Sequence, residues 1–340
     1  SSTRMDKDSL IIDKLVKIAD LKKSYTSLER NIERARGYHD EFETLRGLTD
    51  AKTRFKSESR IQEDSVEYLD TLMDQIIKEI IQLTREGGYT PEDKEGITFS
   101  RIYSPLTDTL LKCTCPEGAV EEWYKEITPP YRDKVTGGLT LSNANLCLQP
   151  ALGDYEGGIE GLLVNHFSEE AMPDDMVCND SDISCDGIVK TKQFFISSLP
   201  KILMIQIKRF SFDAVAGLPD KLYNSIEFKG ELDMRDYLKE GYETDDTVYK
   251  LTSVVNHIGQ FGPDSGHYTA DCLEKGKWKN YNDESVFAYP EGSHPGDYEA
   301  NKQTCYLLFY RLKSVVEAEE EEARREGDTE AEAAAAEAAA

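Results

Sequence analysis

The chain has 340 residues, with 40 Lys and Arg against 65 Asp and Glu, which gives a formal net charge of −25. An excess of negative charge of this size repels nucleic-acid phosphates and anionic membranes, so neither is an expected partner and a basic protein fits better. No apolar run approaches the roughly 20 residues that a membrane helix needs. The seven cysteines are scattered along the chain. They favour free thiols or a metal site, and a cytoplasmic or nuclear location, over a disulfide framework.

Two helical patterns come first in the chain. Residues 1–48 show apolar side chains at helical spacing, namely Leu10, Ile11, Leu15, Ile18, Leu21 and Leu28. This segment fits either a docking helix for a protein partner or an amphipathic helix packed on its own domain. A second helix is predicted from Gln62 to about Thr84, with an apolar face of Val66, Leu69, Leu72, Met73, Ile76, Ile77 and Ile80.

From Gly96 onward the pattern changes to short β-rich runs separated by Gly, Pro and Asp turns. The clearest predicted strands are Ile202 to Phe210, Leu251 to His257, His267 to Leu273 and Tyr306 to Leu312. Residues 154–188 are acidic and predicted to be loop-rich, and the Glu- and Ala-rich end of the chain is predicted to be a solvated tail. Helices followed by antiparallel strands indicate an α+β fold.

The segment from Val254 to Val286 contains the residues most suited to catalysis. Gly266 precedes His267 at the predicted start of a strand, and a turn at Lys275-Gly276 leads into a second strand that ends near Asn282. Two antiparallel strands would place Asn282 near His267. An amide or carboxylate beside an imidazole fixes its tautomer, which is the task of the third residue in a Cys-His-Asn or Cys-His-Asp site.

This segment resembles the His box of the ubiquitin-specific proteases, which are papain-like deubiquitinating enzymes. The family's Gly-His-Tyr tripeptide stands here as Gly266-His267-Tyr268, and its later aromatic and acidic pattern stands as Trp278, Tyr281, Asn282 and Asp283. Other family-like stretches occur in the family's order: Gln62 to Leu69, Leu199 to Phe210, Lys221 to Tyr237, His257 with Gly259, and Thr304 to Tyr310.

The resemblance implies a papain-like α+β cysteine protease fold of the ubiquitin-specific protease type, with palm and fingers present and the thumb truncated or replaced. It divides the chain into an unassigned helical segment (1–48), a catalytic-like domain (49–313) and an acidic Ala/Glu-rich tail (314–340). The implied partner is ubiquitin or a ubiquitinated protein.

The resemblance also assigns roles to individual residues. His267 would be the general base and acid, and Asn282 would orient it, with Asp283 as an alternative. Six residues would bind the ubiquitin tail: Gln62, Asp64, Glu67, His257, Gly266 and Tyr268. The acidic pair fits a basic tail. Carboxylates at a helix N-terminus are also favoured without any ligand, so a structural role for that pair stays open.

The family's nucleophile-bearing Cys box has no counterpart in this sequence, which contains no cysteine before Gln62. Cys305 lies in a Thr-Cys-Tyr fragment, but it occupies the pattern of the closing strand, where a core position is expected. One expectation is that the Cys box precedes Ser1 and that the chain is an inactive part of a deubiquitinase. The other is a pseudoenzyme that binds ubiquitin or acts as a scaffold.

Zinc is the cofactor that the resemblance suggests for this chain. Many family members hold Zn²⁺ with two Cys-x2-Cys pairs, whereas this chain has Cys113-x-Cys115 and Cys178-x6-Cys185 in the corresponding places. Neither pair has the two-residue spacer that makes a strong zinc signal. A zinc site and free thiols therefore remain alternatives, and no other cofactor is expected.

Overall fold

The computed structural model describes residues 11, 14, 15, 17, 44–52, 64–85, 106–113, 122–126, 147–173, 189–213, 218–260, 262, 263, 265–321 and 325. The chain forms two compact units. The first comprises Ser1–Phe99, Pro130–Ala144 and Phe261–His267, and the second comprises Ser100–Pro129, Asn145–Gln260 and Tyr268–Ala340.

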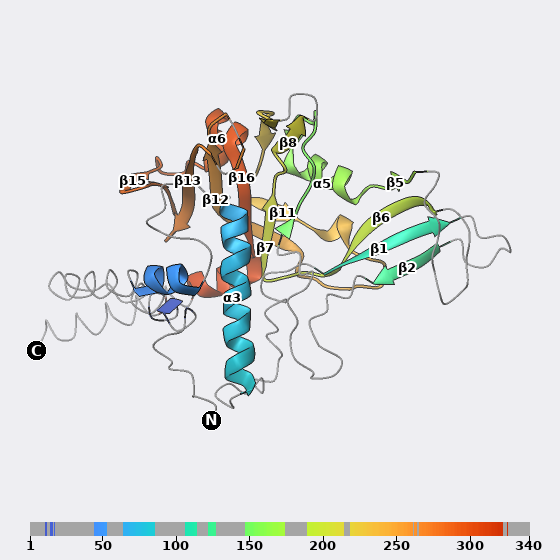
Figure 1. Ribbon diagram of the computed structural model, residues 1–340, viewed down its shortest axis with the longest axis horizontal. Coiled ribbons are helices and arrows are strands. Elements are labelled where there is room, and N and C mark those ends of the chain that lie inside the picture. Colours follow the sequence, from blue (N-terminus) through green and yellow to red (C-terminus); the bar gives the residue numbers. More distant parts are fainter. Residues whose placement is uncertain are drawn as a thin grey trace, which may run out of the picture. The chain divides into compact units, whose positions relative to one another are not determined.

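The first unit is built around the helix α3 (Ser65–Arg85) (Figure 1). Asp64 caps this helix, because its Oδ1 accepts a hydrogen bond of 2.8 Å from the backbone N–H of Val66. A second helical stretch, 44–52, is joined to α3 by an ion pair of 2.6 Å between Lys52 and Glu79, whose side chain is only 2% exposed. The helix predicted from Gln62 to Thr84 is therefore confirmed, with its start placed at residue 65.

The N-terminal pattern is described at residues 11, 14, 15 and 17, all of which are helical, and at 44–48. Ile11 is fully buried. The other positions of the predicted 1–48 segment lie outside the described residues. Both interpretations of the segment, a docking helix for a protein partner and an amphipathic helix packed on its own domain, therefore stay predictions.

The second unit is dominated by one sheet of eight strands. The strand order is β15-β14-β13-β12-β16-β7-β3, and β11 pairs with β12 off this path. Antiparallel pairing joins β11 to β12, β12 to β16, β13 to β14, β14 to β15 and β16 to β7, whereas β3 pairs with β7 in parallel. The bounds are β3 (Cys147–Leu148), β7 (Ile202–Gln206), β11 (Glu231–Asp233), β12 (Val248–Ile258), β13 (His267–Glu274), β14 (Lys277–Asn282), β15 (Ser285–Ala288) and β16 (Cys305–Leu312).

A second sheet has four strands in the order β2-β1-β6-β5. Figure 1 shows its three longer strands as a ribbon of neighbouring arrows. The bounds are β1 (Leu106–Cys113), β2 (Glu122–Glu126), β5 (Glu170–Ala171) and β6 (Val189–Ser198). Two small pairs join β4 (Gly157–Gly158) to β10 (Ile226–Glu227) and β8 (Phe210–Asp213) to β9 (Leu218–Lys221).

Short helices complete the second unit: α5 (Ile159–Phe167), η2 (Arg235–Tyr237), η3 (Pro295–Asp297) and α6 (Glu299–Thr304). Residues 313–321 are helical, and Val316 is only 5% exposed, so the start of the predicted solvated tail packs against the protein. Among the residues described by the structure, no helix is long and apolar enough to cross a membrane.

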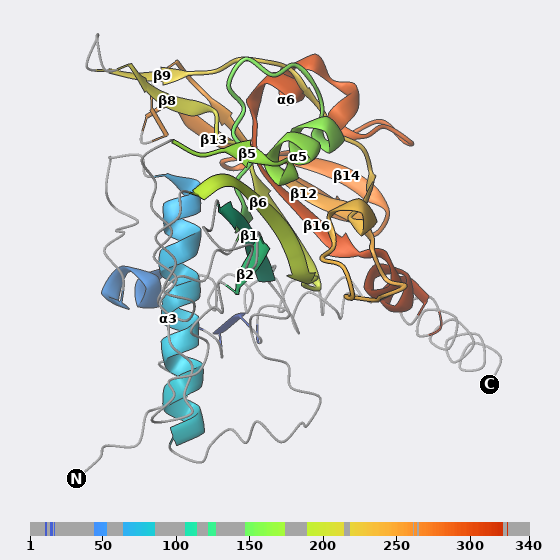
Figure 2. The same ribbon diagram turned by 90° about the vertical axis from the view of Figure 1, so that its right-hand side faces the viewer.

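The helix α5 corrects the expectation that residues 154–188 are loop-rich. Ile159, Leu162, Leu163 and Phe167 follow helical spacing, and all four are buried in the core of the second unit. Figure 2 shows α5 next to the strand β6. Burying an apolar side chain of this size contributes about 1.5–3 kcal/mol. Tertiary burial therefore selects a helix in a segment whose flanking glycines and acids suggest a loop.

The four predicted strands are present, and one of them is divided. The predicted strand from Ile202 to Phe210 is interrupted after Gln206, and β8 begins at Phe210. Between them the N–H of Arg209 donates to the carbonyl of Ile207 at 2.8 Å, which bends the chain. The bend turns the Arg209 side chain into the protein, where it is 0% exposed. The α+β fold class is confirmed.

Candidate functional site

The β13–β14 hairpin carries the candidate acid-base residues. Its two-residue turn is Lys275-Gly276, and both residues have positive φ, at 48° and 74°. Such values suit a tight hairpin turn, and Gly276 adopts its value without strain. The strands pair from Glu274↔Lys277 to Ala270↔Tyr281. The predicted hairpin is therefore present.

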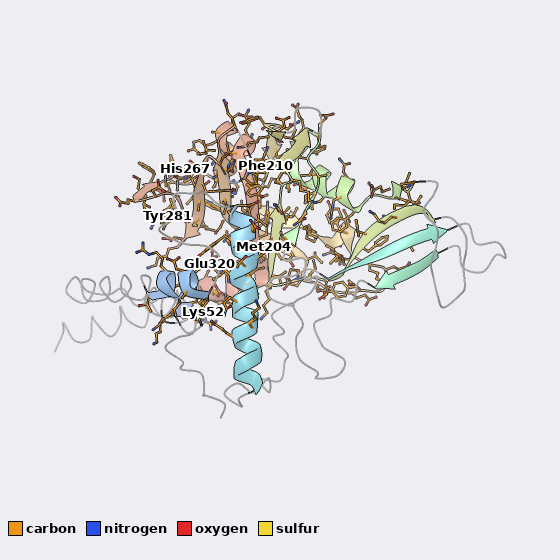
Figure 3. The ribbon with its side chains drawn as sticks, in the orientation of Figure 1. Lys52, Met204, Phe210, His267, Tyr281 and Glu320 are labelled. Carbon is orange, nitrogen blue, oxygen red and sulfur yellow. The ribbon has the colours of Figure 1, made fainter. Side chains whose placement is uncertain are left out.

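β13 begins at His267, the last residue of a segment of the first unit, and β14 ends at Asn282 in the second unit. Figure 3 labels His267 at the start of its strand and Tyr281 near the end of the neighbouring strand. Both His267 and Asn282 are half-buried. That the amide of Asn282 orients the imidazole of His267 stays a prediction.

Asp283 occupies a different position from Asn282. It lies in the turn between β14 and β15, beyond the pair Asn282↔Ser285, with a φ of 49° and an exposed side chain. Asp is one of the residues that adopt this left-handed conformation most readily. The backbone therefore explains an acid at residue 283 without a catalytic role, whereas Asn282 ends a paired strand.

Gly266 precedes the hairpin with a φ of 114°, a conformation that side chains disfavour. It is exposed. Both properties suit close approach of another backbone, as predicted for a channel that accepts an extended tail.

Tyr268 and His257 contact each other through their rings. The ring centroids lie 4.8 Å apart in an edge arrangement, and Phe210 packs against the other side of His257 at 5.1 Å. His257 is 0% exposed, whereas Tyr268 is half-buried. Burial opposes direct contact of His257 with a bound tail, and its predicted tail-binding role stays a prediction. His257 supports the ring of Tyr268 from behind.

Lys221, at the end of β9, completes this cluster and was not singled out by the sequence. Its Nζ lies 3.0 Å from His257 Nδ1 and donates to the carbonyls of His257 at 2.6 Å and Gly259 at 3.2 Å. The residue is 3% exposed. Burial, together with the nearby guanidinium of Arg209, lowers the pKa of Lys221 to about 8.

Asp271, on β13, is another buried residue that the sequence pattern did not indicate. Its carboxylate accepts hydrogen bonds from Asn256 Nδ2 at 2.7 Å, Asn280 Nδ2 at 2.8 Å and the Tyr289 hydroxyl at 2.8 Å, and Asn301 Nδ2 lies 3.4 Å away. Burial and the bond to Asp271 raise the pKa of Tyr289, which keeps its phenol protonated as a donor. These contacts tie β12, β14 and the segment after β15 to β13.

Arg209 belongs to the family-like stretch and is wholly internal. Its guanidinium donates to the carbonyls of Cys305 at 2.6 Å, Lys302 at 2.6 Å, Asn224 at 2.8 Å and Leu222 at 3.2 Å. Carbonyl dipoles from two separate segments thereby solvate the charge in place of water. The residue fixes the start of β16 against the chain that follows β9.

The acidic candidates at the start of α3, Asp64 and Glu67, differ in exposure and in hydrogen bonding. Asp64 caps the helix, so the structural explanation for its presence is supported. Glu67 is exposed in the first turn of α3. Gln62 lies outside the described residues. The predicted ubiquitin contacts of all three stay predictions.

Three cysteines are described with free thiols: Cys147, Cys272 and Cys305. Cys305 is 0% exposed and burial raises its pKa, which confirms the expected core position and opposes reactivity. Cys147 is 4% exposed. Cys272 follows His267 on the same strand by five residues, and at about 3.3 Å per residue the two side chains cannot meet.

The zinc candidates are mostly beyond what the structure describes. Cys113 ends β1, while Cys115, Cys178 and Cys185 lie outside the described residues. Within the described part of the chain, no group of three or more His, Cys, Asp and Glu side chains is arranged to hold a metal. The choice between zinc and free thiols at these four cysteines stays a prediction.

The fold and the hairpin agree with comparison to known proteins. The family model described as ubiquitin carboxyl-terminal hydrolase matches residues 12–310. The chain belongs to this family, as the resemblance predicted. The match begins inside the segment 1–48 that the sequence left unassigned, and the predicted domain boundaries at residues 48 and 313 stay predictions.

Curated relatives match over part of their length. Mouse ubiquitin carboxyl-terminal hydrolase 3 is 37% identical over 122 residues, which are 35% of this chain and 22% of the relative. Ubiquitin carboxyl-terminal hydrolase 8 of Saccharomyces cerevisiae is 31% identical over 159 residues, which are 44% of this chain and 31% of the relative. The matched part thus spans less than a third of each of these relatives.

Solved structures show the same fold. The SAGA Ubp8/Sgf11/Sus1/Sgf73 DUB module bound to ubiquitin aldehyde matches with a TM-score of 0.65 and 20% identity, over 91% of this chain and 60% of that chain. A yeast SAGA DUB module with a mutant Sgf73 matches with a TM-score of 0.61 and 21% identity, over 91% and 59%. At these identities the likeness establishes the fold, which is that of the ubiquitin-specific proteases.

Proposed function

We propose that this chain supplies the ubiquitin-tail channel and the acid-base histidine of a thiol-dependent ubiquitin hydrolase, and that by itself it hydrolyses nothing. The observation that carries the proposal is the β13–β14 hairpin, whose first strand begins at His267 directly after the positive-φ Gly266 and whose second strand ends at Asn282. Membership of the hydrolase family supports the same reaction class.

In the proposed reaction His267 takes the proton of a cysteine thiol, and the thiolate attacks the carbonyl at the end of the ubiquitin tail. The imidazolium then returns the proton to the leaving amine, and water hydrolyses the acyl-enzyme. The amide oxygen of Asn282 would accept from the other ring N–H and hold His267 in the required tautomer. Tyr268 and Gly266 would line the path of the two terminal glycines.

The three cysteines whose side chains the structure describes support the proposal that the chain alone is inactive. Cys147 and Cys305 are buried, and Cys272 is too far along β13 to reach His267. We therefore propose that the nucleophile belongs to sequence that precedes residue 1. Free thiols at these three positions also support the proposal of a reducing compartment, cytoplasmic or nuclear.

A fluorogenic ubiquitin-amide substrate tests this proposal. The chain alone should release no fluorophore, although it should bind ubiquitin. A protein extended by the reading frame upstream of residue 1 should release fluorophore, and H267A in that longer protein should abolish the release. Hydrolysis by the chain alone that H267A also abolishes would refute the assignment of the nucleophile.

The second candidate function is a ubiquitin-binding scaffold without catalysis, in which a protein partner also docks on the N-terminal helical segment. Among the described cysteines, Cys147 and Cys305 are buried and the half-buried Cys272 cannot reach His267 along β13, and this favours the scaffold. The same longer protein discriminates the two functions. If the longer protein binds ubiquitin through the ubiquitin tail but hydrolyses no substrate, the result supports the scaffold function over the hydrolase function.

A further inference from the structure

The strongest unassigned feature is the buried ammonium of Lys221. An ammonium has three N–H donors and no acceptor, and three acceptors face it: His257 Nδ1 at 3.0 Å, the His257 carbonyl at 2.6 Å and the Gly259 carbonyl at 3.2 Å. The match of three donors to three acceptors explains how a lysine that is 3% exposed is tolerated. It also requires His257 to be neutral with its proton on Nε2.

These bonds act on the end of β12 and on its continuation. Gly259 has a φ of 145° and receives a second hydrogen bond of 2.7 Å at its carbonyl, from the hydroxyl of Tyr223. Lys221 Nζ also lies 5.2 Å from the centre of the Tyr223 ring. Lys221 and Tyr223, which are two positions apart in the chain, therefore both hold Gly259, the residue directly after β12.

The same histidine also contacts β13. The centroid of the His257 ring lies 4.8 Å from that of Tyr268 on β13, 5.1 Å from that of Phe210 and 6.5 Å from that of Tyr306. A histidine whose Nδ1 accepts from Lys221 has a fixed ring plane. The plane of His257 in turn sets the position of the Tyr268 ring.

We propose that Lys221 is a positioning residue that, through His257, holds the end of β12 at Gly259 and the ring of Tyr268 in the arrangement that accepts the ubiquitin tail. The proposal rests on the proposed function for its ligand. Lys221 does not contact the tail itself, since it is buried beneath His257.

The arrangement depends on the charge of Lys221. The titratable and charged groups that face its cluster are Arg209 next to β8, Tyr223 after β9, His257 on β12, Tyr268 on β13 and Tyr306 on β16. A neutral amine has two N–H donors for three acceptors, so one bond is lost on deprotonation. The pKa of Lys221 is about 8, so the arrangement is complete below this pH and weakens as the pH rises through it.

Binding of two ubiquitin forms tests the proposal. The affinity of the chain is measured for ubiquitin and for ubiquitin that lacks its two terminal glycines, and the ratio of the two reports tail recognition. K221M should lower this ratio by about 5- to 10-fold, the effect of one or two hydrogen bonds, and leave the affinity for truncated ubiquitin unchanged. K229M, at a lysine whose side chain is 74% exposed, should leave both unchanged.

Two further readouts separate positioning from loss of folding. In the wild-type protein the ratio should fall between pH 7 and pH 9, with a midpoint near the pKa of about 8. In K221R, whose guanidinium stays charged, the ratio of the two affinities should stay constant between pH 7 and pH 9. The ¹⁵N shifts of His257 should show the Nε2–H tautomer in the wild type at pH 7, without any ubiquitin present.

The outcomes are distinguishable. A wild-type ratio near one would overturn the proposed function, and the positioning role with it. A high wild-type ratio that K221M preserves, or that shows no fall up to pH 9, would overturn the positioning role alone. An Nδ1–H tautomer of His257 would do the same, since Lys221 could not then donate to that atom.

Discussion

Asp271 offers the sharpest test of how the hairpin is held, because its carboxylate is 0% exposed and accepts from three strongly bonded donors on separate segments. Replacing it with alanine removes all of these acceptors at once and leaves the donors in place. The fold around His267 would then depend on backbone pairing alone.

The magnitude follows from the surroundings of each donor. A donor that stays buried without an acceptor costs about 1–3 kcal/mol, and one that reaches water costs less. Asn256 is 1% exposed and bears the full cost, whereas Asn280 and Tyr289 are half-buried. Removal of the buried carboxylate returns part of the loss. We expect D271A to lower the free energy of unfolding by about 3 kcal/mol.

Urea unfolding followed by tryptophan fluorescence measures this loss, since Trp278 on β14 is 8% exposed and reports on the hairpin. D245A is the matched control, because Asp245 is exposed and should change stability by less than about 0.5 kcal/mol. Equal unfolding midpoints for D271A and D245A would refute the reasoning, since the buried donors would then have found other acceptors.

Two further substitutions test the core. R209M should lower the free energy of unfolding by about 3 kcal/mol or more, since carbonyls of two segments lose their donor, while R235M at an exposed arginine should have almost no effect. A stable R209M would show that packing alone fixes the start of β16. L163A should cost about 2–5 kcal/mol in the same urea assay, because Leu163 of α5 is 0% exposed. A loss below about 1 kcal/mol would place α5 outside the cooperative core.

The hairpin and the closing strand were predictable because their signals are local. Alternating side chains on either side of Lys275-Gly276 specify two strands and a turn, and the positive φ values at these two residues are what such a turn requires. The family-like order of motifs then identified His267 and Asn282. The structure confirmed their shared hairpin, while their roles stay proposals.

The bend at Arg209 and the helix α5 were not predictable, because each depends on distant residues. The strand pattern from Ile202 continues to Phe210, yet the bend lets Arg209 reach the carbonyl of Cys305, which is 96 positions away. The helix α5 forms because four side chains enter a core supplied by other strands. Neither partner is visible within a short window of sequence.

The sequence by itself determined the α+β class, the family and the hairpin that ends at His267 and Asn282, since repeat spacing and turn residues act over a few positions. Only the tertiary structure decided that His257 is a buried support, that Asp271 anchors the hairpin and that Lys221 faces three acceptors. Lys221 and His257 are 36 positions apart in the chain. The value of a buried polar group depends on the partners that folding brings to it, and residue type alone does not specify them.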